Sequence, residues 1–151
     1  MKKLFTMAAL LTAALSMACF TGCAPKPKQI GLQLYSVNQD MGDVEASLQK
    51  VADAGYNVVE TLGSPECFGL PAAEFKALCD SKGIKIVSTH TAIGMDPNDE
   101  EGVMNKWRAV FDGLKTMGAK YCVIPGFGLG SNLEELQGVC DYFNKVGKLA
   151  K

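Results

Sequence analysis

The sequence predicts an α/β protein in which helices cover a parallel sheet. Four short apolar segments, rich in β-branched residues, alternate with four segments whose apolar residues recur at helical spacing. Three helix-to-strand junctions are also alike, each with one glycine between helix and strand: Ala54-Gly55-Tyr56-Asn57, Lys82-Gly83-Ile84-Lys85 and Met117-Gly118-Ala119-Lys120. A repeat of βα units with nearly continuous apolar strands is typical of a buried parallel sheet.

Residues 1–23 have the pattern of an export signal, with two lysines ahead of an apolar stretch that is too short for an ordinary membrane span. Phe20-Thr21-Gly22-Cys23 resembles the lipobox of bacterial lipoproteins, although Phe stands where Leu is usual. We therefore expect a lipoprotein signal peptide over 1–23, lipidation at Cys23 and a stiff tether over 24–28. The protein would then be an exported, membrane-anchored lipoprotein on the periplasmic side of the cell envelope. An ordinary signal peptide cleaved elsewhere is the alternative.

The first repeat unit begins with a strand over 29–37, where apolar side chains (Ile30, Leu32, Leu34) alternate with Gly31, Gln33 and Tyr35. Asp43 is then placed to cap a helix that ends at Gly55. Residues 56–61 follow at once as the second strand.

The second helix begins at Pro71, carries the apolar stripe Phe75, Leu78 and Cys79, and ends at Gly83. Residues 82–91 then form the third strand, an apolar run that closes on hydroxyls and on the chain's single histidine, His90. Two-residue alternation places Ile86, Ser88 and His90 on one face of this strand. Its polar end is expected at the C-terminal edge of the sheet, where α/β enzymes carry their chemistry.

The third helix follows 96–99 and carries an apolar stripe that includes Trp107, and Gly118 ends it. Residues 119–125 form the fourth strand, which leads into the glycine-rich loop 126–130. Asn132 with Glu135 then gives a capping-box-like start to the last helix.

Composition argues for one small domain that does not bind nucleic acid. Without the signal, about 128 residues remain, which is enough for one domain over 29–151 with a real core. The 15 Lys and Arg residues nearly balance the 16 Asp and Glu residues, whereas phosphate binding needs clustered basic side chains. Four cysteines follow the signal without a CxxC motif (Cys67, Cys79, Cys122 and Cys140), and we expect buried hydrophobic thiols rather than a disulfide or metal framework.

Four βα units make half of a TIM barrel, because a complete barrel needs eight strands and roughly 250 residues. The fold class we predict is therefore α/β, the N-terminal half of a (β/α)8 barrel with four parallel strands and four helices after a signal peptide. No fifth strand follows 148–151, so we expect a truncated reading frame. A self-sufficient four-stranded α/β domain is the competing explanation.

Several segments together resemble the sugar phosphate isomerase/epimerase family, the xylose isomerase-like TIM barrels of the apurinic endonuclease type 2 superfamily. These segments cover nearly all of 29–151 and are 30–36, 54–60, 82–90, and Trp107 ahead of 111–121. The resemblance implies a site at the C-terminal ends of the strands, and a divalent metal held by Glu, Asp and His. In that family the metal ligands and carboxylate bases mostly lie on the fifth to eighth strands, which are absent from this chain.

Isomerisation or epimerisation beside a sugar carbonyl requires a base for a weakly acidic C–H and a metal or acid for the enediolate oxygen. Glu60 is the one acid that the pattern places inside the barrel mouth, so it is the candidate catalytic residue. Gln33, Tyr35, Glu60 and His90 are the candidate substrate-binding residues. The alternatives are that Glu60 is a solvent-exposed carboxylate and that His90 bonds to a backbone carbonyl near the rim. Tyr35 and Gln33 could instead serve packing in the top layer of the barrel.

Two further features have simpler interpretations. Trp107 lies on an apolar helix stripe, which favours core packing over stacking against a sugar. The loop 126–130 offers backbone N–H groups to an anion, but an ordinary βα turn fits its position after the fourth strand better.

The sequence thus predicts a metal-dependent sugar (phosphate) isomerase/epimerase-like protein, of which this chain alone has little or no activity. A non-catalytic, membrane-tethered carbohydrate-binding module is the second hypothesis. The expected partners are a small-molecule sugar, the membrane through a lipid anchor, and a second copy of the chain through exposed half-barrel edges.

Overall fold

The computed structural model describes residues 28–151. The predicted export signal, Cys23 and nearly all of the tether 24–28 lie outside the described residues. The elements in chain order are β1 (Gly31–Gln33), the 3₁₀ segment η1 (Leu34–Asp40), α2 (Val44–Asp53), β2 (Val58–Leu62), β3 (Glu66–Cys67), β4 (Leu70–Pro71), α3 (Ala72–Ser81), β5 (Lys85–His90), α4 (Glu100–Met117), β6 (Tyr121–Val123) and α5 (Leu133–Leu149).

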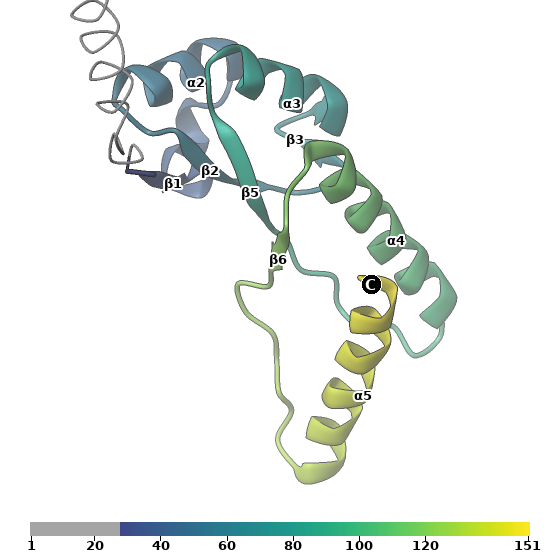
Figure 1. The fold of residues 1–151 in the computed structure, drawn as a ribbon. Helices are drawn as coiled ribbons and strands as arrows, with labels where there is room; N and C mark the ends of the chain where they lie inside the picture. The colour runs from purple at the N-terminus through teal and green to yellow at the C-terminus, as the bar shows by residue number, and fades with distance from the viewer. Residues whose placement is uncertain (1–27) are drawn as a thin grey trace, which may run out of the picture.

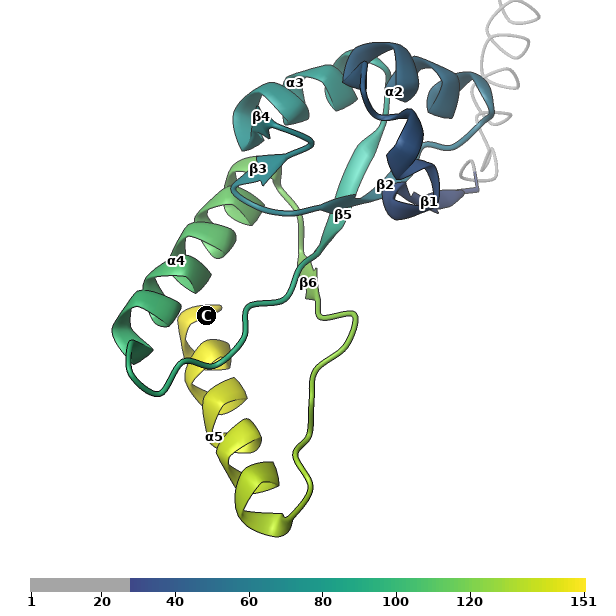
Figure 2. The same cartoon turned by 180° about the vertical axis from the view of Figure 1, so that it is seen from behind.

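The main sheet has four parallel strands in the order β1-β2-β5-β6, as the βα repeat predicts. This order follows the chain without reversal, so each crossover steps in the same direction and the helices gather on one face. Figure 1 shows α2, α3 and α4 along that face, and Figure 2 shows the same layers from behind. A doubly wound sheet would reverse its strand order and carry helices on both faces. The structure is therefore half of a TIM barrel.

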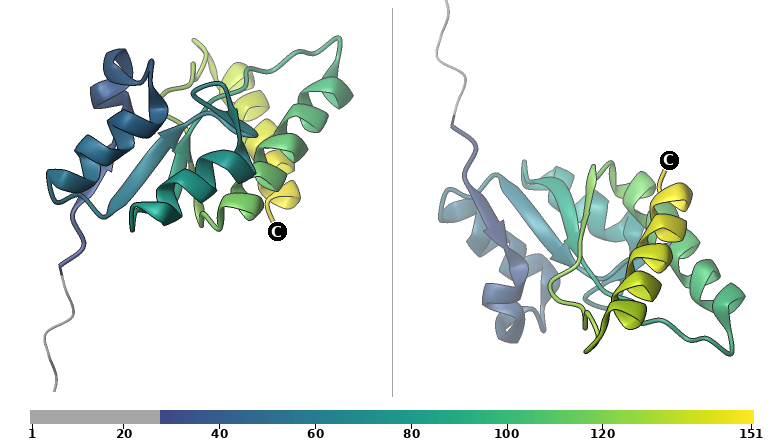
Figure 3. Two further views of the ribbon diagram at one scale, coloured as in Figure 1. Left: turned by 90° about the horizontal axis from the view of Figure 1, so that it is seen from above. Right: turned by 90° about the horizontal axis from the view of Figure 1, so that it is seen from below.

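The core lies between the sheet and these helices. Leu32, Val59 and Ile86 are aligned across the three strands β1, β2 and β5 and belong to one apolar cluster. From the helices, Leu48, Phe75 and Trp107 complete it as fully buried side chains. At the β6 end, α5 lies beside α4 (Figure 3).

Three helices begin at a side-chain cap: Asp43 and Asn132 were predicted as caps, and Asp99 is the last residue of the segment 96–99 predicted to precede α4. The side chains of Asp43, Asp99 and Asn132 each accept a hydrogen bond from a backbone N–H in the first turn of α2, α4 and α5, at 3.0, 2.9 and 3.0 Å. The glycines of the three repeated junctions have φ angles of +91°, +69° and +70°, which a residue with a Cβ adopts only with strain. Both features were readable from residue type and position.

The first strand is shorter than the predicted 29–37. It pairs with β2 only over Gly31–Gln33, and the chain then turns into η1, which is interrupted at Val37. Leu34 is buried by this turn, while Tyr35 leaves the sheet and is exposed. A small antiparallel pair, β3 with β4, occupies the loop where no strand was predicted.

The third strand contains a β-bulge that its sequence does not reveal. Val59 is aligned with Ile86, but Glu60 is aligned with Ser88, so Val87 is an extra residue on β5. The two-residue alternation predicted that Ile86 shares a face with Ser88 and His90. That prediction was wrong for Ile86, which faces the helices with Val59 because the bulge reverses the alternation.

The four cysteines between residues 28 and 151 are free thiols. Cys67 and Cys79 are buried and Cys122 is half-buried, as expected for small hydrophobic side chains. Cys140 is exposed, which corrects the expectation that it lies in the core. The buried stripe of α5 consists instead of Val139, Tyr142 and Val146. In the described range, no helix combines the length and apolarity needed to cross a membrane.

Alkylation at about pH 8 is expected to label Cys140 much faster than Cys79. Burial raises the pKa of Cys79 to about 12 and, with the nearby Glu60 carboxylate, that of Cys122 to about 11. Because these pKa values lie above the ordinary 9.0, the stability these thiols contribute is present below pH 9 and is lost as the pH rises toward the folded-state values. Peptide mass spectrometry of the alkylated chain measures each rate, and equal labelling of Cys79 and Cys140 would contradict this burial.

Candidate functional site

The structure brings together all four predicted substrate-binding side chains at the C-terminal ends of neighbouring strands. Gln33 ends β1, Glu60 lies within β2 and His90 ends β5, while Tyr35 follows in the first turn of η1. The sheet register aligns Gln33 with Glu60, and Glu60 with Ser88. Paired residues of parallel strands project to the same face, so these side chains form a row on the face opposite the helices.

A continuous set of hydrogen bonds joins this row. Gln33 Nε2 donates to Glu60 Oε1 at 2.5 Å and lies 3.3 Å from His90 Nδ1. Ser88 Oγ donates to the other carboxylate oxygen, Glu60 Oε2, at 2.6 Å. Both oxygens of Glu60 are therefore held by neighbouring strands, which fixes the carboxylate in one orientation.

Tyr35 forms one wall of this cluster. Its ring lies edge-on to the His90 imidazole, with ring centroids 5.9 Å apart and an interplanar angle of 63°. The tyrosine side chain is otherwise exposed. The cluster thus combines an aromatic surface, an amide, an imidazole and a carboxylate, which are the groups that bind sugar rings and hydroxyls.

Ser88 is a functional candidate that sequence reasoning did not select. It is 5% exposed, and its hydroxyl contacts the central carboxylate. Its position two residues before His90 was the available signal, since the two residues share a face. A serine at such a place is otherwise an ordinary strand residue, so only the contact with Glu60 identifies it.

The same face of the sheet continues onto β6 with apolar side chains. Tyr121 and Val123 are aligned with Ser88 and His90, and they are 65% and 36% exposed. In a complete barrel this face would be the interior. Within residues 28–151, β1 pairs only with β2 and β6 only with β5, so one backbone edge of each strand has no strand partner.

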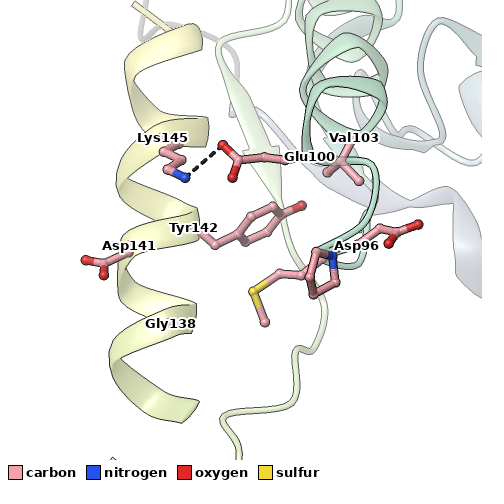
Figure 4. Close-up of a pocket in the computed structure, with 9 residues that line it drawn as sticks. Asp96, Glu100, Val103, Gly138, Asp141, Tyr142 and Lys145 are labelled. Carbon is pink, nitrogen blue, oxygen red and sulfur yellow. Dashed lines mark hydrogen bonds and ion pairs between the residues drawn. The ribbon is translucent and has the colours of Figure 1, made fainter. Parts of the chain in front are cut away.

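A pocket of about 260 Å³ lies elsewhere, between α5 and the segment before α4 (Figure 4). Across it, Lys145 Nζ pairs with Glu100 Oε1 at 2.7 Å. Tyr142 OH accepts from Trp107 Nε1 at 2.6 Å and donates to Ile93 O at 2.7 Å. Burial raises the pKa of Tyr142, so its hydroxyl keeps the proton that it donates.

These contacts connect α4 with α5, and they explain the burial of the Trp107 side chain. Its side chain is 1% exposed and stacks on Phe111 at 5.7 Å. The interpretation of Trp107 as core packing is therefore confirmed.

The loop 126–130 and the start of α5 do not form an open anion site. The Glu135 carboxylate accepts from Ser131 N at 2.5 Å, and Asn132 Oδ1 accepts from Glu135 N. Glu134 and Glu135 also place two negative charges in the first turn. The N-terminus of α5 is thus occupied by its own side chains, which supports an ordinary βα turn.

A divalent metal does not fit the cluster on its own. Between residues 28 and 151, no group of three His, Cys, Asp or Glu side chains is placed to hold a metal ion. Glu60 and His90 are the two potential ligands in the cluster. A closed or catalytic zinc site needs at least three protein ligands.

Comparison with solved structures agrees with this fold, whereas no family model and no curated protein matches the chain. A sugar phosphate isomerase/epimerase from Parabacteroides distasonis is 30% identical with a TM-score of 0.72, over 82% of this chain and 50% of that one. A second one from the same organism is 24% identical with a TM-score of 0.72, over 85% and 49%. The IolI protein, solved with a zinc atom, is 13% identical with a TM-score of 0.62, over 82% and 48%.

The chain therefore spans about half the length of each of these three structures. Its four parallel strands lie side by side in the order in which they occur in the chain, and its helices lie on one face of the sheet. The described residues form the N-terminal half of a xylose isomerase-like TIM barrel, the fold of the sugar phosphate isomerases/epimerases.

Proposed function

We propose that this chain supplies the N-terminal half of the substrate site of a sugar or sugar phosphate isomerase/epimerase-like protein. The observation that carries the proposal is the network of Gln33, Glu60, Ser88 and His90 at the C-terminal edge of the sheet, the edge where TIM barrels bind substrates. The 30% identity with a sugar phosphate isomerase/epimerase supports the same class.

In this proposal Gln33, Tyr35 and His90 bind sugar oxygens, and Glu60 orients Gln33. Moving a proton beside a carbonyl takes a base and a group that stabilises the developing oxyanion. The cluster contains one carboxylate, which cannot supply both groups, so we expect the chain alone to have little or no activity. The base, and any divalent metal such as the zinc in the IolI structure, would be held by residues outside those described.

Calorimetry with free hexoses and hexose phosphates tests this proposal. The chain should bind at least one of them, and Gln33→Leu should weaken binding about 3–10-fold, because a neutral hydrogen bond contributes about 0.5–1.5 kcal/mol. Gln137→Leu is the matched control, since Gln137 is an exposed amide on α5 that bonds only to Asp141 among the described residues. Absence of binding to every sugar tested, or equal weakening by both changes, would contradict the proposal.

A non-catalytic carbohydrate-binding module is the second candidate. The presence of a single carboxylate in the cluster favours it, because isomerisation needs a base and a second group that stabilises the developing oxyanion. For both candidates we also propose that the chain is exported, lipidated at Cys23 and anchored on the periplasmic side of the cell envelope. Sugar binding by the chain without interconversion, also after metal addition, separates a binding module from an isomerase.

Self-association is the expected consequence of the exposed inner face. Tyr121 and Val123 lie on that face with no helix above them, next to the unpaired edge of β6. Exposed apolar side chains beside an open strand edge favour pairing with another chain. Sedimentation velocity should show dimers or larger species at micromolar concentration, with Tyr121→Lys shifting the chain toward monomer, and a monomer at all concentrations would contradict this expectation.

A further inference from the structure

The hydrogen bonds around Glu60 indicate which ring nitrogen of His90 carries the proton. Gln33 Nε2 lies 2.5 Å from Glu60 Oε1 and 3.3 Å from His90 Nδ1. A primary amide nitrogen has two hydrogens and accepts none. One nitrogen of Gln33 therefore serves both neighbours, each with one hydrogen.

Glu60 decides which end of the Gln33 amide enters the network. An ionised carboxylate only accepts hydrogen bonds, so an amide oxygen in this place would face a second acceptor at contact distance. Ser88 Oγ holds the other carboxylate oxygen at 2.6 Å and keeps Glu60 from turning away. The amide nitrogen must therefore face Glu60, and its second hydrogen is available to His90 Nδ1.

We propose that Glu60, acting through Gln33, sets the tautomer of the neutral His90 ring, with the proton on Nε2. An Nδ1 that accepts from Gln33 carries no proton, and in a neutral imidazole the other nitrogen then carries it. A protonated Nε2 has no lone pair for a metal. His90 is thus a hydrogen-bond donor to a substrate oxygen and not a metal ligand, while Gln33 and Glu60 are positioning residues.

This assignment also indicates which chemical groups of the substrate bind at the cluster, and in that respect it rests on the proposed function. The cluster offers one donor from His90, one acceptor from Gln33 Oε1 and the hydroxyl of Tyr35. No Lys or Arg is among its members, and Glu60 adds a negative charge. Such a set suits the hydroxyl and carbonyl oxygens of a sugar, whereas a phosphate group would be repelled by the carboxylate.

The tautomer can be measured directly because His90 is the only histidine in the chain. Long-range proton–nitrogen NMR spectra of the ring, recorded without sugar at about pH 8, distinguish the two nitrogens. We expect one species, with Nε2 protonated and Nδ1 unprotonated. A predominant Nδ1–H tautomer in the unmodified chain would overturn the proposal without any variant.

Two variants test the role of the positioning residues. In Glu60→Met, Gln33 remains but loses the acceptor that orients it, so the ring resonances should move to an average of both tautomers. Gln33→Met removes the donor itself and should have the same effect. The matched control is Gln137→Met on α5, which should leave the ring spectrum unchanged.

Unchanged ring resonances in Glu60→Met would contradict the positioning role of Glu60, even if Gln33→Met failed to fold. Since no sugar is present, the measurement is independent of the proposed function. A chain with the Nε2–H tautomer that binds no sugar would disprove the sugar site alone. A sugar-binding chain with the other tautomer would disprove this inference alone.

Discussion

Replacing Trp107 with alanine is expected to lower the free energy of unfolding by about 3–5 kcal/mol, the range for removing a large buried aromatic side chain. Trp107 is 1% exposed, stacks on Phe111 and donates to Tyr142 OH at 2.6 Å. Its loss would leave a cavity where α4 meets α5. Urea unfolding followed by circular dichroism measures the change.

Trp107→Phe is the control for this prediction. It keeps an aromatic ring against Phe111 but removes the indole donor, while Tyr142 OH still donates to Ile93 O. The expected loss is smaller, about 1–2 kcal/mol, since part of the packing and one hydrogen bond are lost. If Trp107→Ala cost less than about 1 kcal/mol, Trp107 would not be part of the core, and stacking against a ligand would regain support.

Replacing Glu60 with methionine is expected to weaken sugar binding about 10–100-fold. The carboxylate accepts from both Gln33 and Ser88, and hydrogen bonds to a charged group contribute about 1.5–3 kcal/mol each. Without them the Gln33 amide and the His90 ring lose their fixed orientation. Calorimetric titration with the best-binding sugar measures the effect.

Glu66→Met is the matched control, because Glu66 is an exposed carboxylate on the β3 strand. It should leave the affinity within about twofold, as expected for a surface substitution. Ser88→Ala should give an intermediate loss, since Gln33 still holds one oxygen of Glu60. If Glu60→Met and Glu66→Met bound sugar equally well, the Glu60 network would have no part in binding.

Much of the fold could be predicted because its signals are local. The junction glycines and the capping residues Asp43, Asp99 and Asn132 act within a few residues of their own position, so their spacing marks the ends of the helices. The parallel sheet followed from the alternation of these helices with apolar strands. The meeting of Gln33, Glu60 and His90 then followed from their positions at strand ends.

Features that depend on pairing with distant residues could not be predicted in this way. The bulge at Val87 exists because Glu60 pairs with Ser88 while Val59 pairs with Ile86, and no local pattern in β5 encodes it. The early end of β1 likewise reflects where β2 stops pairing with it. Cys140 fits the apolar spacing of α5, but the neighbours of that helix bury Tyr142 instead. Ser88 became a candidate only through its contact with Glu60.

The most direct test of the account is NMR mapping of sugar binding on the isotope-labelled chain. Addition of the best-binding hexose or hexose phosphate should shift the side-chain amide of Gln33 and the ring of His90, together with backbone signals at the ends of β1, β2 and β5. Signals of the pocket between α4 and α5 around Tyr142 should stay in place. Shifts confined to that pocket, or none at Gln33 and His90 under saturating sugar, would contradict a sugar site at this edge of the half-barrel.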